Sequence, residues 1–186
     1  MAAPALKDTP LVDDAKPEVA LGNVIDAISK FGDRAAVMRR LEAEDAASKA
    51  RFEEQAKAEW DALKVLRETY LAQPPEKRDI AALDAAIDKR AALSDMKRAV
   101  HDAILNMVRR LVPDVAKATG QPEEWVRRAL AYVTYPAQRD AQHSIDLHFE
   151  MEALASEVDP DNSLSGDVLK PGDDVEAWFK RMMAES

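Results

Sequence analysis

Apolar residues recur at helical spacing through most of this chain, and no stretch shows the alternation expected of a strand. Two stretches, about residues 33–73 and 76–112, carry the pattern for roughly forty residues each. Pro74 and Pro75 separate them, and a proline pair interrupts helices. The pattern predicts an all-α fold, built on a long antiparallel, coiled-coil-like helical hairpin with short flanking helices and flexible termini.

The second long stretch has the more continuous apolar stripe. Its members are Ile80, Leu83, Ile87, Leu93, Met96, Val100, Ile104, Met107 and Leu111. Pro113 follows, and we expect it to end the helix. In the first stretch alanines replace larger apolar residues between Leu41 and Trp60, Phe52 excepted, so burial should stabilise its middle least. Two helices of this length leave apolar surface uncovered, which favours packing of the short helices, of a second copy or of a partner on it.

The rest of the chain divides into shorter segments. Residues 1–16 are predicted to be a disordered tail, and residues 17–157 to form one helical domain in which a short helix packs on the hairpin base. Residues 158–173 are rich in acidic and turn-forming residues and predict a flexible linker. Residues 174–185 predict a last, amphipathic helix. Its apolar positions are Val175, Trp178, Phe179 and Met182.

These four apolar residues have the i, i+3, i+4, i+7 spacing of helices that dock in grooves. Tryptophan and similar large side chains carry much of the binding energy in small interfaces. We therefore expect these four residues to bind a protein partner. Docking onto the hairpin of the same chain explains the pattern equally well, and both interpretations stay open. Binding to a membrane surface is disfavoured, because Asp173, Asp174 and Glu176 would be repelled by anionic lipids.

The net charge of −9 is concentrated near the C-terminus, where residues 157–186 carry −5. The hairpin is almost neutral, so the overall acidity does not exclude a locally basic binding surface. The sequence contains no cysteine, which removes disulfides and thiolate chemistry and suits a reducing compartment. No apolar run approaches the length of a membrane span, so we expect a cytoplasmic protein.

No motif for catalysis, nucleotide binding or metal binding occurs. The histidines His101, His143 and His148 lack the i, i+4 histidine partner of a helical zinc site. No glycine-rich phosphate loop and no nucleophile elbow is present. The sequence therefore predicts a non-enzymatic protein, without a cofactor, metal or evident small-molecule substrate.

Residues 112–135 are similar to a helix-turn-helix, with Gly120 at the turn and Val115 and Val126 at core positions. The candidate DNA-contacting residues in and beside it are Arg109, Arg110, Lys117, Gln121, Arg127 and Arg128. Glu123 and Glu124 face the expected groove and would repel phosphate. The simpler interpretation is a helical corner in which Trp125 packs on the hairpin base.

Two hypotheses follow. The leading one is an interaction or assembly protein that self-associates, as a homo-oligomer, and docks a protein partner through its C-terminal helix. The alternative is a DNA-binding regulator or packaging factor that uses residues 112–135. The combination of long helices, acidity and a terminal docking segment resembles, in layout only, small subunits of phage packaging machines and phage scaffolding proteins. In those packaging subunits the DNA-binding head precedes the oligomerising helices, whereas here the candidate head follows them.

Overall fold

The computed structural model describes residues 10–12, 16–30 and 33–159, and in these ranges the regular structure is helical, with no strand. The helices are α1 (Pro17–Lys30), α2 (Arg34–Ala72), α3 (Ile80–Thr119), α4 (Glu123–Ala131) and α5 (Tyr135–Val158), with a short 3-10 helix, η1 (Pro75–Lys77). The predicted all-α class is confirmed. Within the described ranges, no helix has both the length and the apolarity needed to cross a bilayer.

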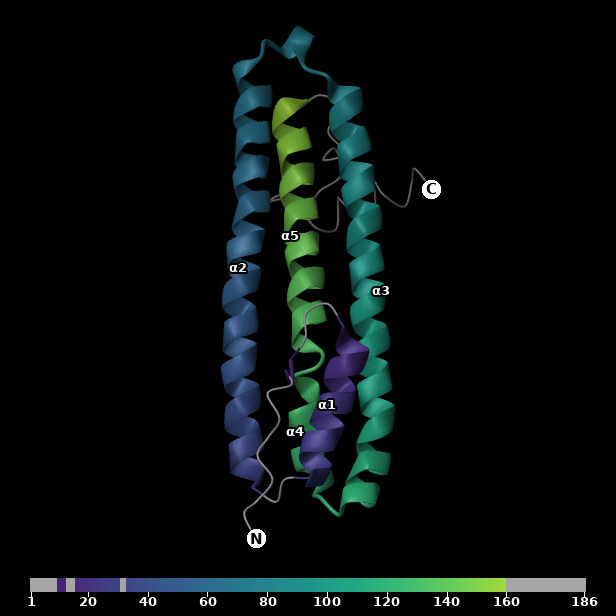
Figure 1. Cartoon of the computed structure of the whole chain (residues 1–186). Coiled ribbons are helices and arrows are strands. Elements are labelled where there is room, and N and C mark those ends of the chain that lie inside the picture. The colour runs from purple at the N-terminus through teal and green to yellow at the C-terminus, as the bar shows by residue number, and fades with distance from the viewer. Residues whose placement is uncertain (1–9, 13–15, 31–32, 160–186) are drawn as a thin grey trace, which may run out of the picture.

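The two long helices, α2 and α3, run antiparallel and are joined through η1, as the prolines predict (Figure 1). Each begins at an aspartate cap. The Asp33 carboxylate accepts a hydrogen bond from the Ala36 amide, and the Asp79 carboxylate accepts one from the Ala82 amide, both at 3.0 Å. These caps satisfy amide groups that the first helical turn leaves without partners.

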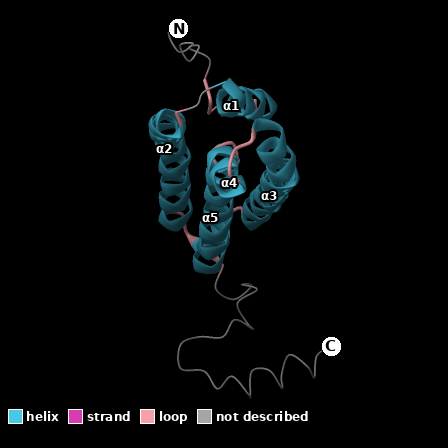
Figure 2. Ribbon diagram, turned by 90° about the horizontal axis from the view of Figure 1, so that it is seen from below, coloured by secondary structure: helices cyan, strands magenta, loops and turns pink. Residues whose placement is uncertain are grey.

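Helix α5 lies between α2 and α3 and packs along both (Figures 1 and 2). The two hairpin helices are therefore spread apart, and their apolar residues contact α5 more than they contact each other. The tip of the hairpin holds the end of α5, because Arg78 donates a hydrogen bond to the Val158 carbonyl at 2.9 Å. Arg67 of α2 also forms an ion pair with Glu157 near that end.

The main apolar core lies at the opposite end, here called the base, where α1 and α4 add to the three long helices (Figure 1). It includes Val24 and Ile28 of α1, Leu41 of α2, Val108 of α3 and Leu130 of α4, each less than a tenth exposed. A smaller cluster near the hairpin tip contains Leu83, Leu154 and Val158. The expectation that the short N-terminal helix packs on the hairpin base is confirmed.

Two expectations are corrected. Helix α3 continues through Pro113 to Thr119 and ends at Gly120, which has a left-handed φ of 65°. The missing proline amide would have bonded the Arg109 carbonyl; both residues are exposed, so water can satisfy that carbonyl. In the expected disordered tail, Leu11 and Val12 are instead buried in the base core. Their amides donate to the Glu44 carboxylate.

Candidate functional site

The predicted partner-binding residues of the C-terminus, Val175, Trp178, Phe179 and Met182, lie outside the described residues. Their role stays a prediction. The candidate DNA-contacting residues are all described and lie at the base, on the end of α3, in the turn after it and on α4.

The helix-turn-helix-like segment forms a packed corner at the base. Trp125 is partly buried against the base core, and the Arg34 guanidinium lies 5.9 Å from the centre of its ring. The same arginine donates a hydrogen bond to the Gln121 side chain at 2.7 Å. Gln121 thus ties the turn to the start of α2, and the packing of Trp125 agrees with the simpler interpretation of this segment.

The basic residues of the corner differ in their surroundings. Arg127 forms ion pairs with Glu123 at 2.6 Å and with Glu124 at 2.8 Å, within its own helix. These carboxylates neutralise the cation that was expected to meet phosphate. The other candidate cations are exposed: Arg109, Arg110, Lys117 and Arg128. DNA binding by these residues stays a prediction.

A layer of polar residues crosses the middle of the molecule between the two apolar clusters. Arg139 of α5 donates hydrogen bonds to Asp45 and Ser48 of α2, both at 2.6 Å. Lys97 of α3 pairs with Asp140 of α5 at 2.8 Å. These bonds connect α5 to both hairpin helices where the alanine-rich part of α2 supplies little apolar area.

His143 lies in this layer with its side chain only 7% exposed. Its ring meets the rings of Phe52 and Trp60 edge-on, at 5.6 Å between centroids in each case. Its Nε2 atom is 3.6 Å from the Glu59 carboxylate, and that carboxylate accepts a 2.5 Å hydrogen bond from Arg90 of α3. The Glu59–Arg90 pair therefore joins α2 to α3 beside the imidazole.

The surroundings lower the pKa values of His143 and Glu59. Burial is the main cause that lowers the pKa of His143 below its ordinary value of 6.5, and it outweighs the attraction of Glu59. The hydrogen bond from Arg90 lowers the pKa of Glu59 below 4.5. At neutral pH the arrangement therefore holds a neutral imidazole next to an ion pair.

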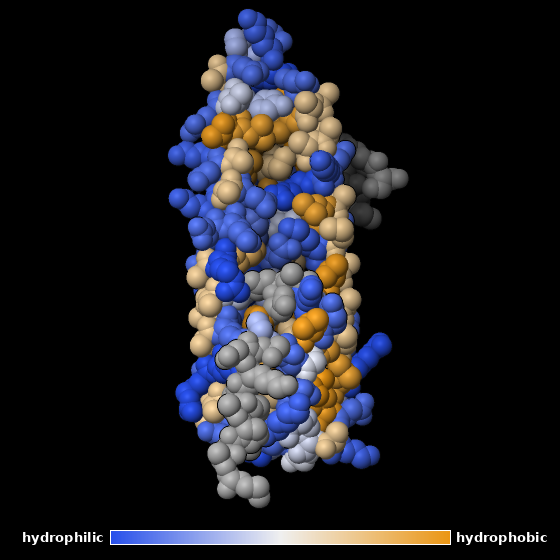
Figure 3. Space-filling view, viewed as in Figure 1, coloured by the Kyte–Doolittle hydropathy of each residue, from blue (hydrophilic) through white to orange (hydrophobic). Residues whose placement is uncertain are grey.

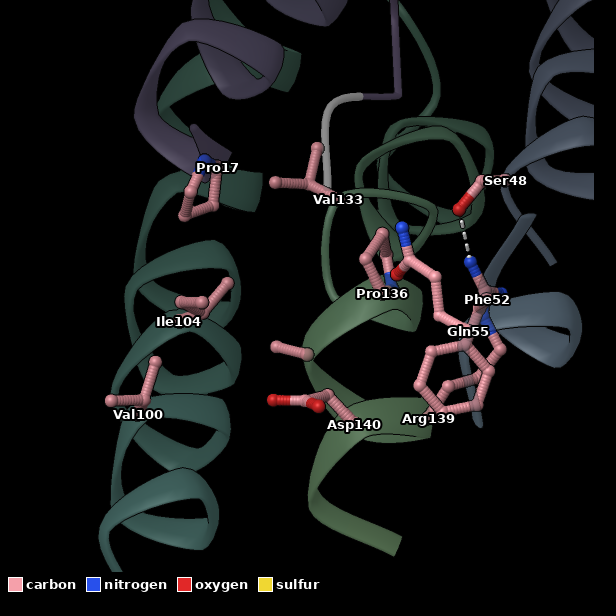
Figure 4. A pocket seen from close by; sticks show the side chains of 11 residues that line it. Pro17, Ser48, Phe52, Gln55, Val100, Ile104, Val133, Pro136, Arg139 and Asp140 are labelled. Carbon is pink, nitrogen blue, oxygen red and sulfur yellow. Dashed lines mark hydrogen bonds between the residues drawn. The ribbon is translucent and has the colours of Figure 1, made fainter. Parts of the chain in front are cut away.

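Two grooves border the polar layer. The first, here called the α2–α3 groove, has a volume of about 370 Å³ and opens beside the start of α1 at Pro17. Figure 4 shows Val100 and Ile104 of α3 on one side of it. Asp140 of α5 and Phe52 of α2 lie across from them in the same view.

The second, here called the α2–α5 groove, has a volume of about 460 Å³. Its apolar floor comes from Phe52, Ala56 and Trp60, which follow one another at four-residue steps along α2. Charged and polar residues line the rest of it: Lys49, Glu53, Lys57, Arg139, Gln142, His143 and Asp146.

The side chains of the polar layer are engaged mainly with one another, through hydrogen bonds and ion pairs that link helices. Among the described residues, no group of three or more histidine, aspartate or glutamate side chains is placed to hold a metal ion. The exposed aromatic edge of Trp60, which is 37% exposed, is the feature most typical of an interface.

Sequence reasoning missed the polar layer. One signal was present in the sequence. Ser94 follows Ile87 by seven residues, so it occupies a position of the α3 stripe where a buried helix face normally has an apolar residue. The partners of Ser94, Arg139 and His143 come from other helices and could not be read from local spacing.

Comparison of the chain with protein-family models, with curated proteins and with solved structures finds no match.

Proposed function

We propose that this protein is a non-enzymatic interaction protein, which self-associates through the α2–α5 groove and docks a protein partner through residues 174–185. The self-associating surface consists of Phe52, Ala56 and Trp60 on α2 together with Phe149 on α5. Phe149 is 60% exposed and follows Gln142 of the groove by seven residues, so it lies on the same face of α5. This exposed aromatic edge beside an apolar groove is the observation that carries the proposal.

The charges around the groove suit contact with a second copy. Lys49 and Lys57 lie on the α2 side, and Asp146 lies on the α5 side. A two-fold interface places the same surface on both copies, so the lysines of one copy can face the aspartate of the other. Aromatic side chains at the centre with charges at the rim are the usual arrangement of a stable interface.

The partner-binding part of the proposal rests on sequence. The spacing of Val175, Trp178, Phe179 and Met182 supports it, together with the acidic segment that separates them from α5. A tethered helix of this kind binds with an affinity set mainly by its few large apolar side chains.

Multi-angle light scattering on two matched variants tests the self-association. Phe149→Asp places a charge on the proposed surface and should lower the measured mass toward that of the 20.6 kDa chain. Val65→Asp is the control, because Val65 is 61% exposed but is turned about 140° around α2 from Trp60. Equal masses for the wild type and the two variants would contradict the proposed surface.

A further inference from the structure

The apolar stripe of α3 is uncovered in its middle, between the base core and the tip cluster that contains Leu83. At the base, Ile104 is buried, and Met107 and Leu111 pack on the core to which α1 contributes. Toward the hairpin tip the same stripe continues with Val100, which is 50% exposed, and Met96, which is 56% exposed. Hydrophobic side chains gather along α3 on this face (Figure 3).

The uncovered part begins where α1 begins. Pro17, the first residue of α1, lines the α2–α3 groove together with Val100 and Ile104. From there α1 runs toward the base, so beyond its first residue no described helix lies on this face of α2 and α3 (Figures 1 and 2). The groove is thus a position for one more helix, in line with α1.

We propose that residues 174–185 of the same chain occupy this position as a helix, packed on Leu93, Met96 and Val100. The apolar positions match in length: Val175 and Met182 are seven residues apart, as are Leu93 and Val100. Two helices with this repeat pack side by side, as in a coiled coil. Trp178 and Phe179 then lie over the α2–α3 groove.

The connection is long enough. Helix α5 ends at the hairpin tip, where Arg78 bonds the Val158 carbonyl. Met96 lies sixteen residues after Ile80, the first residue of α3, which is about 24 Å down the helix. Residues 160–173 span up to roughly 46–50 Å when extended. A linker of this length gives the tethered helix an effective concentration on the order of millimolar, which favours its own chain over a second copy.

This inference does not rest on the proposed function, because it needs neither a partner nor an oligomer. It does add a consequence: a protein partner that binds Trp178 and Phe179 must first displace them from the groove. The apparent affinity for such a partner is reduced by the fraction of chains in which the segment is docked.

Cysteine crosslinking of the full chain tests the inference, since the natural sequence contains no cysteine. The double variant Met96→Cys with Met182→Cys should crosslink within one chain. The control, Gln138→Cys with Met182→Cys, uses an exposed residue that is eleven positions before Phe149 and shares its face of α5. We expect the first pair to crosslink about tenfold faster, at equal labelling of the single thiols.

Adding Trp178→Ala and Phe179→Ala to the first pair should remove this advantage, while circular dichroism keeps the helical signal of the parent. Equal rates for the two cysteine pairs would overturn the inference, because they would show that the tethered segment approaches α3 and α5 equally often. Crosslinks mainly between chains would also overturn it, and would assign the groove to the segment of a second copy.

Discussion

Ser94 of α3 donates a hydrogen bond to the backbone carbonyl of Ser144 of α5 at 2.8 Å, and the two hydroxyl groups are 3.0 Å apart. Both residues are buried, and Ser144 is fully so. A side chain can reach the backbone of a neighbouring helix only where the helices approach closely. The serine pair therefore marks the point in the polar layer where α5 is held against the hairpin.

Replacing Ser144 with leucine should destabilise the protein by about 1–3 kcal/mol, because the larger side chain has no space between α3 and α5. Ser144→Ala should cost less than about 1 kcal/mol, since Ser94 keeps its bond to the carbonyl. Urea unfolding of the two variants measures the difference. Equal losses would contradict the close approach of the helices at this residue.

Stability should fall as the pH drops below 6.5. The pKa of His143 is lowered in the folded protein by burial, so the unfolded chain takes up a proton that the folded chain resists. The charged groups around the ring are Glu59 of α2, Arg90 and Lys97 of α3 and Asp140 of α5. Below pH 4.5 Glu59 adds to the loss, because its own pKa is lowered by Arg90.

The measurement is the urea midpoint from about pH 8 to about pH 5. In His143→Phe, which keeps an aromatic ring beside Phe52 and Trp60, the part of the loss that begins near pH 6.5 should disappear. The matched control is His101→Gln, whose ring nitrogen lies 3.2 Å from an exposed carboxylate of Asp102. A pH profile that is unchanged in His143→Phe would show that another group is responsible.

Arg139 and Arg127 each form two polar contacts, but we expect their replacement to change the free energy of unfolding by different amounts. Arg139 is 17% exposed and bonds Asp45 and Ser48, so Arg139→Met leaves a largely buried carboxylate and should destabilise by about 1–3 kcal/mol. Arg127 is 56% exposed, and its replacement by methionine should change stability by less than about 1 kcal/mol. Thermal unfolding of both variants checks the order, and a larger effect at Arg127 would refute it.

Two glycine-to-alanine substitutions should act in opposite directions. At Gly120 the left-handed φ of 65° strains any side chain, so alanine should destabilise by about 1–2 kcal/mol. Gly22 lies inside α1, and an added methyl group meets no atom within 4 Å, so alanine should stabilise by roughly 0.5–1 kcal/mol. The same sign for both in thermal unfolding would be inconsistent with these backbone conformations.

Much of the fold could be predicted from the sequence because the decisive signals are local. Pro74 and Pro75 mark the turn, Asp33 caps α2, and the spacing of Leu93 to Leu111 marks one face of α3. The continuation of α3 through Pro113 could not be predicted, because its reason is not local. A proline is tolerated inside a helix when the carbonyl it leaves unbonded can reach water, and that depends on which face is exposed.

The grooves and the polar layer could not be predicted in the same way. Whether α2 and α3 pack on each other or on α5 depends on how helices far apart in the sequence assemble. His143 lies beside Glu59, and Arg139 bonds Asp45, so these contacts join positions about 84 and 94 residues apart. Local periodicity carries no information about such pairs.

Sedimentation equilibrium of the 186-residue chain over about a hundredfold range of concentration measures self-association without a mutation. If the protein self-associates, the average mass rises with concentration above that of the 20.6 kDa chain, toward a whole multiple of it. A single species of 20.6 kDa at every concentration would contradict self-association.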